Sequence, residues 1–122
     1  MSNPTSKPVN VAVVGLGFMG QTHLKSYLQL PNARIVAVCD AARLPVDGVL
    51  AGVSGNIHGT DAINLGKDIR TYKKLEELLA DSEVDLIDLC VPTPLHGPQA
   101  IAALQSGKHV LCEKPLARTS AT

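Results

Sequence analysis

The stretch Val9–Gly20, VNVAVVGLGFMG, decides the fold, because it joins a buried strand to a helix through a glycine-rich turn. Residues Val9–Val14 form a nearly continuous β-branched run, which is typical of a strand buried on both faces. From Phe18 to Gln29 apolar residues recur at helical spacing, and Pro31 is expected to end the helix. The sequence therefore predicts a strand, a tight turn and a helix in direct succession.

The turn between this strand and this helix carries the pattern G-x-G-x-x-G at Gly15, Gly17 and Gly20. In that setting Gly15 permits the tight turn, Gly17 lets the backbone come close to a pyrophosphate, and Gly20 lets helix and strand pack together. The unpaired N–H groups at the helix start, where Phe18 and Met19 lie, are expected to hold the phosphates. This arrangement predicts a dinucleotide site.

An acidic residue stands where a dinucleotide site needs one. Asp40 lies 20 residues after Gly20, directly behind a second apolar run at Arg34–Cys39. A carboxylate there can accept hydrogen bonds from the adenosine ribose hydroxyls, and it repels a 2′-phosphate. The pattern favours NAD as the cofactor and leaves NADP open, because Arg43 is close enough to pair with a phosphate if the loop folds back.

The rest of the chain alternates between predicted strands and helices. Strands are expected at 69–72, 86–91 and 109–112, and helices at 73–80 and 97–106. Pro92-Thr93-Pro94 predicts an extended turn, and Gly107 a left-handed helix cap. Alternation of this kind indicates a doubly wound parallel sheet with helices on both faces, the Rossmann class of α/β fold.

Two segments depart from that regularity. Residues 1–8 are expected to form a flexible tail, which leaves 9–122 as the dinucleotide-binding domain. In Ala41–Lys67, Pro45 and five glycines break the periodicity, so we expect an irregular insertion with at most a helical turn or two at 46–50.

Composition excludes several classes of function. Eleven basic and eleven acidic residues give no net charge, and only 2% of residues are aromatic, which argues against nucleic-acid binding. No apolar run is long enough for a membrane span, so we expect a cytoplasmic protein. Cys39, Cys90 and Cys112 read as reduced core thiols. No metal site is predicted, since His58 and His109 lack partners at ligand spacing.

Two stretches of the second half resemble a known family. V-P-T-P-L-H at Val91–His96 and A-I-A-A-L-Q-S-G-K-H-V-L-C-E-K-P-L-A at Ala100–Ala117 resemble the glucose-fructose oxidoreductase and inositol dehydrogenase family, Gfo/Idh/MocA. The E-K-P element in register after G-K-H-V is specific to it. The resemblance implies an NAD(P)-dependent oxidoreductase that transfers hydride between nicotinamide and a hydroxyl-bearing carbon of a sugar or polyol.

The resemblance also assigns roles to individual residues. Pro92 and Thr93 would line the nicotinamide-ribose side of the cleft, and His96 would lie near the nicotinamide. Glu113 would contact that ribose. Lys114 would be catalytic, helping to polarise or deprotonate the substrate hydroxyl.

The chain departs from the family pattern in length. Members usually carry a second domain that supplies substrate contacts and much of a homo-oligomer interface. We expect this domain to be absent here, together with the last helix and strand of the first domain. A non-catalytic module that binds or senses NAD(H) is therefore an alternative to the enzyme, and an S-adenosylmethionine-dependent methyltransferase is a further one that E-K-P counts against.

Overall fold

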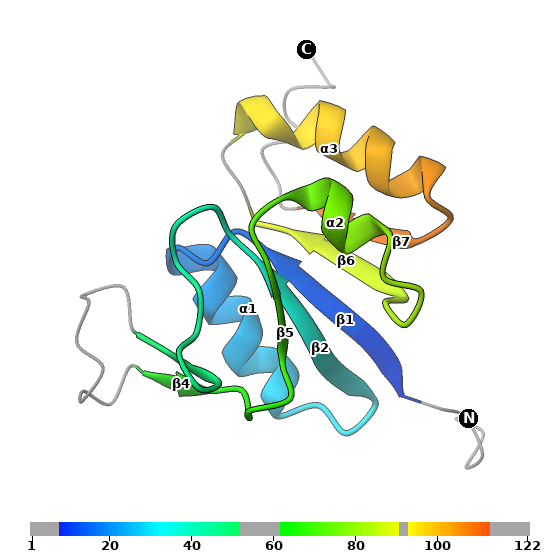
Figure 1. Cartoon of the computed structure of the whole chain (residues 1–122). Helices are drawn as coiled ribbons and strands as arrows, with labels where there is room; N and C mark the ends of the chain where they lie inside the picture. The colour runs from blue at the N-terminus through cyan, green and yellow to red at the C-terminus, as the bar shows by residue number, and fades with distance from the viewer. Residues whose placement is uncertain (1–7, 52–61, 91–92, 113–122) are drawn as a thin grey trace.

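The computed structural model describes residues 8–51, 62–90 and 93–112, with the backbone alone at 93–97 and 112. Strands and helices follow one another along the chain as shown in Figure 1. The elements are β1 (Val9–Val14), α1 (Phe18–Leu28), β2 (Ala33–Cys39), β3 (Val49–Leu50), β4 (Ile63–Asn64), β5 (Arg70–Tyr72), α2 (Leu75–Leu79), β6 (Leu86–Leu89), α3 (Thr93–Gln105) and β7 (His109–Cys112).

The main sheet has five parallel strands in the order β5-β2-β1-β6-β7. The chain first builds outward from β1 through β2 to β5, and then crosses over to β6 on the other side of β1. In open α/β sheets, ligands bind at the carboxyl ends of the strands where the winding direction reverses. That point lies between β1 and β6.

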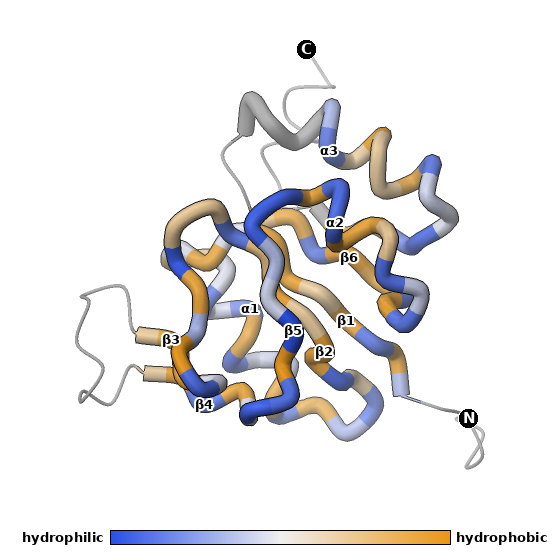
Figure 2. Tube along the Cα trace, viewed as in Figure 1, coloured by the Kyte–Doolittle hydropathy of each residue, from blue (hydrophilic) through white to orange (hydrophobic). Residues whose placement is uncertain are grey.

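Alternate residues of the central strand face opposite layers of the fold. Val11 and Val13 of β1 pack in a cluster with Leu24 of α1. Ala12 of the same strand packs on the other face in a cluster with Leu78 of α2 and with residues of α3. The hydrophobic colouring follows the central strands through the sheet (Figure 2). Helices therefore cover both faces, which confirms the predicted doubly wound α/β fold.

The segment after β2 is more regular than the sequence analysis predicted. Strands β3 and β4 pair antiparallel, and residues 46–50 form no helical turn. Val46 and Val49 exchange two backbone hydrogen bonds of 2.9 Å. The two residues between them have positive φ, 52° at Asp47 and 82° at Gly48. Asp-Gly is the residue pair that favours such a turn, so the signal was present in the sequence and was missed.

Helix α3 starts earlier than predicted. It begins at Thr93, so the extended turn expected at Thr93 and Pro94 is wrong. A proline is tolerated in the first turn of a helix, where its missing N–H would have no partner. The other end of the helix agrees with the sequence, since Gly107 has a φ of 88° and its N–H donates to the Leu104 carbonyl at 3.0 Å.

No helix in the described residues is both long enough and apolar enough to span a bilayer.

Candidate functional site

A cleft of about 630 Å³ opens at the carboxyl ends of the central strands. Its walls come from the ends of β1, β2 and β6, from the glycine turn, and from the start of the segment that follows β5. The cleft therefore lies at the switch point of the sheet. The lining residues are Val14, Gly15, Gly17, Phe18, Met19, Cys39, Asp40, Ala41, Arg43, Lys73, Leu75, Cys90 and Gln99.

The three glycines of the turn differ in what surrounds them. Gly15 has a φ of 91°, a conformation that side chains disfavour, and its N–H donates to the Cys39 carbonyl at 2.8 Å. A Cβ on Gly20 would overlap the carbonyl oxygen of Gly15. A Cβ on Gly17 would have no heavy atom of the described residues within 4 Å. Gly15 thus makes the turn, Gly20 lets helix and strand touch, and Gly17 faces open space.

The start of helix α1 offers free backbone donors beside that space. Gly17 is the N-cap residue, no side chain caps the helix, and its first turn holds no acidic residue. The Gln21 N–H makes a helical bond to the Gly17 carbonyl at 3.0 Å, whereas the amides before it lie ahead of the helical ladder. An anion is favoured at such an end by these donors and by the helix dipole. The site fits the diphosphate of a dinucleotide.

Asp40 connects the second strand to the glycine turn. Its Oδ2 accepts a hydrogen bond from the Leu16 N–H at 2.7 Å, and its Oδ1 accepts from the Ala42 and Arg43 N–H groups, both at 2.8 Å. Burial raises the pKa of Asp40, but the backbone donors of Arg43, Leu16 and Ala42 outweigh burial and hold the pKa below its usual value. The group is therefore an anion at neutral pH. A carboxylate offers about four acceptor positions, so one remains for a ribose hydroxyl.

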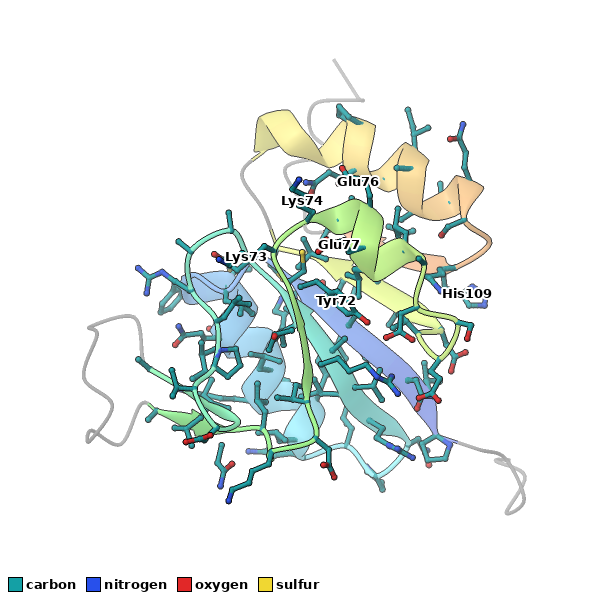
Figure 3. All side chains as sticks on the ribbon, in the orientation of Figure 1. Tyr72, Lys73, Lys74, Glu76, Glu77 and His109 are labelled. Atoms are coloured by element: carbon teal, nitrogen blue, oxygen red, sulfur yellow. The ribbon has the colours of Figure 1, made fainter. Side chains whose placement is uncertain are left out.

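Two polar side chains on the cleft wall were not assigned to the site from the sequence. Lys73 follows β5 at the entrance to α2 (Figure 3) and lines the cleft together with Arg43. The Oε1 atom of Gln99 on α3 is buried and has no hydrogen-bond partner among the described residues. A buried acceptor without a partner is costly, so a bound ligand that donates to Gln99 would relieve that cost.

Cys39, at the end of β2, is a free thiol in the wall of the cleft. Burial, followed by the negative charge of Asp40, raises its pKa to about 11. Since the thiolate is the reactive form, Cys39 is an inert packing residue, in agreement with its predicted role as a reduced core thiol.

The structure brings together most of the predicted site residues that it describes. Gly15, Gly17, Phe18, Met19 and Asp40 line the cleft, and Gly20 lies behind it against the turn. The other predicted residues cannot be placed: Pro92, Glu113 and Lys114 lie outside the described residues, and the side chains of Thr93 and His96, in the first turns of α3, are not described.

Comparison with known proteins agrees with this geometry. Residues 9–122 match the Gfo/Idh/MocA family, an oxidoreductase family with an NAD-binding Rossmann fold. A levoglucosan dehydrogenase of Pseudarthrobacter phenanthrenivorans is 35% identical over 91% of this chain and 27% of its own. An α-N-acetylgalactosaminidase of Shewanella oneidensis is 30% identical over 95% of this chain and 24% of its own.

The fold also matches solved structures. The crystal structure of an NAD-binding oxidoreductase from Klebsiella pneumoniae superposes with a TM-score of 0.64 at 31% identity, covering 89% of this chain and 28% of that one. The chain thus spans about a quarter of the length of the relatives that it matches.

Proposed function

The chain belongs to the Gfo/Idh/MocA family of oxidoreductases with an NAD-binding Rossmann fold, and from this premise we propose that its cleft binds NAD as the cofactor domain of a sugar or polyol oxidoreductase. The observation that carries the proposal is the open space at Gly17, in front of the uncapped start of α1. The diphosphate would lie there, because the backbone can approach it closely and its N–H groups would donate hydrogen bonds to the phosphates.

Asp40 and Arg43 govern which dinucleotide the cleft prefers. Asp40 is anionic and turns its remaining acceptor capacity to the ribose of the adenosine half. A 2′-phosphate would be repelled by this carboxylate, although Arg43 and Lys73 on the same cleft wall offer compensating charge. We therefore expect NAD to bind more tightly than NADP. The positive charges of Arg43 and Lys73 should reduce this difference in affinity.

Bound nicotinamide supplies a hydride donor or acceptor, and the protein supplies binding and proton transfer. In the proposed reaction the neutral amine of Lys114 would take up the proton of the substrate hydroxyl as hydride leaves the carbon, and the ammonium formed would stabilise the remaining negative charge on the oxygen. Glu113, Pro92 and Thr93 would hold the nicotinamide ribose, and His96 would lie beside the nicotinamide. These roles follow from the E-K-P and V-P-T-P-L-H motifs of the family.

The similarity to an α-N-acetylgalactosaminidase favours a second candidate function, cleavage of a glycosidic bond. Both candidates use a sugar substrate, but they differ in what happens to the cofactor. An NAD-dependent dehydrogenase converts NAD to NADH as it oxidises its substrate. A glycosidase releases sugar without net NADH. The two readouts are NADH absorbance with levoglucosan and nitrophenol release from a nitrophenyl α-N-acetylgalactosaminide.

Cofactor binding is tested by calorimetric titration of the purified chain with NAD, NADP and S-adenosylmethionine. We expect heat for NAD, less for NADP and none for S-adenosylmethionine. Absence of heat with both dinucleotides, from a sample that circular dichroism shows to be folded, would overturn the proposal. Binding of NAD without turnover of any sugar or polyol by the full-length protein would favour the non-catalytic NAD-binding module.

The catalytic proposal is tested separately with Lys114→Ala in the full-length protein, since the substrate domain supplies part of the active site. We expect turnover to fall while the affinity for NAD stays within about twofold, because the lysine acts on the substrate rather than on the diphosphate. An equal loss of affinity and turnover would remove Lys114 from the catalytic role.

A further inference from the structure

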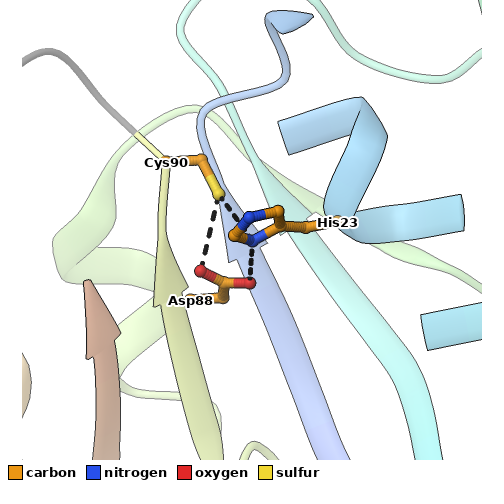
Figure 4. Close-up of side chains that lie close together, drawn as sticks. All are labelled: His23, Asp88 and Cys90. Carbon is orange, nitrogen blue, oxygen red and sulfur yellow. Dashed lines mark hydrogen bonds and ion pairs between the residues drawn. The ribbon is translucent and has the colours of Figure 1, made fainter. Parts of the chain in front are cut away.

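A second group of chemically active side chains lies beneath the glycine turn, between α1 and β6. Asp88, in the middle of β6, is fully buried and faces α1. Its Oδ2 lies 2.6 Å from Nδ1 of His23 and accepts a 2.7 Å hydrogen bond from the Tyr27 hydroxyl. Figure 4 shows the carboxylate pointing at the imidazole across the space between strand and helix.

Cys90, just beyond the end of β6, completes the group. Its Sγ lies 3.4 Å from Oδ1 of Asp88 and 3.4 Å from Nδ1 of His23 (Figure 4). A nucleophilic relay needs the cysteine and the carboxylate on opposite ring nitrogens. Here both contact Nδ1, so the arrangement does not fit a catalytic triad.

We propose that His23, Asp88 and Cys90 form a binding site for Zn²⁺. The donor atoms, one nitrogen, one carboxylate oxygen and one sulfur, all lie within 4.8 Å of one another. Imidazole, carboxylate and thiolate are the ligands that Zn²⁺ takes, whereas a thiolate disfavours Mg²⁺ and Ca²⁺.

Two of the three printed donor spacings lie close to those of tetrahedral zinc. With Zn–S of about 2.3 Å and Zn–N or Zn–O of about 2.0–2.1 Å, neighbouring donors lie about 3.3–3.6 Å apart. Both distances from Cys90 Sγ are 3.4 Å, inside that range. His23 Nδ1 contacts the other carboxylate oxygen, Oδ2, at 2.6 Å, so the imidazole and the carboxylate have to shift for a single oxygen to join Nδ1 and Sγ around the metal.

Two further features support the site. Tyr27 donates to the same carboxylate, which is the kind of outer partner that orients a metal ligand. Cys90 lines the cleft, so the metal has a path from solvent through the described residues. The site brings together residues 65 positions apart in sequence. The spacing of histidines along the chain predicted no metal site, whereas the fold brings His23 together with Asp88 and Cys90.

The test is a titration of the chelator-treated chain with Co²⁺, a spectroscopic substitute for zinc, followed by displacement with Zn²⁺. We expect one equivalent to bind with a thiolate-to-metal charge-transfer band that zinc abolishes. Cys90→Ser should lose the band, whereas Cys39→Ser, the matched control at a buried thiol outside the cluster, should keep it. His23→Gln should weaken the affinity at least tenfold, and Tyr27→Phe should weaken it less.

Absence of the band in the unsubstituted chain, or its persistence in Cys90→Ser, would overturn the proposal. If Cys90→Ser fails to fold, the folded His23→Gln variant decides, since an unchanged metal affinity there would contradict the site. NAD binding is measured separately by calorimetry. A failure to bind NAD would therefore not change the result expected for Co²⁺ and Zn²⁺.

Discussion

The carboxylate of Asp40 accepts a 2.7 Å hydrogen bond from the backbone N–H of Leu16, which fixes the end of β2 to the glycine turn after β1. Leu16 is itself fully buried. The residue expected to recognise the ribose therefore also shapes the turn that holds the diphosphate. Changes at Asp40 should affect both halves of the proposed cofactor site.

Replacing Asp40 with alanine removes acceptors from three backbone N–H groups. Because two of these groups are exposed and can turn to water, we expect a loss of only about 1 kcal/mol in the free energy of unfolding. The affinity for NAD should fall about tenfold or more, since the turn loosens and the ribose loses an acceptor. Urea unfolding and calorimetry measure the two effects, and an unchanged NAD affinity would contradict the role of Asp40.

Asp40 should also contribute to the pH dependence of stability. Its pKa is lowered in the folded chain, so its contribution is complete above the unfolded value of about 3.9 and is lost as the pH falls through the lower, folded value. We expect the chain to be more stable than Asp40→Asn at pH 7 and the difference to shrink below about pH 4. Urea denaturation of both proteins at pH 7 and pH 3 tests this. A difference that is constant or grows on acidification would contradict it.

Local patterns predicted the part of the fold that positions the cofactor site. The β-branched run at Val9–Val14 forms β1 with the predicted bounds. Gly15 has the positive φ that the glycine pattern requires, and Gly20 has the close packing against the turn. These features depend on neighbours in sequence. The Asp47-Gly48 turn was equally local and was overlooked because the surrounding glycines obscured the pattern.

The contacts that were not predicted join residues distant in sequence. Asp88 stands inside an apolar run, which indicates a buried acid that needs a hydrogen-bond partner. The sequence does not show which residue that partner is. The partners, His23 and Tyr27, lie more than 60 residues away on α1, and only the packing of this helix on the sheet brings them together. Lys73 and Gln99 reach the cleft for the same reason.

Cys39 should be unreactive while the chain is folded. With a pKa of about 11, only about one thiol in ten thousand is ionised at pH 7, and the side chain is buried as well. We expect no alkylation of Cys39 by iodoacetamide in native buffer and rapid alkylation in urea, as measured by peptide mass spectrometry. The denatured sample is the control for reagent access. Native labelling at the denatured rate would show that β2 does not bury this thiol.

Gly17 and Gly20 form a matched pair that separates cofactor binding from folding. A methyl group at Gly20 collides with the carbonyl of Gly15, so Gly20→Ala should cost at least about 2 kcal/mol of stability. A methyl group at Gly17 meets open space on a backbone with a φ of −77°, so Gly17→Ala should change stability by less than about 1 kcal/mol.

The same methyl group at Gly17 occupies the space proposed for the diphosphate. We therefore expect Gly17→Ala to lower the affinity for NAD at least tenfold, a loss of about 1.4 kcal/mol in binding free energy, in a protein that unfolds like the unsubstituted chain. Thermal denaturation and calorimetry of the two variants, side by side, measure both quantities. If Gly17→Ala binds NAD normally, the diphosphate does not approach the turn at this residue, and the placement of the cofactor in the cleft is wrong.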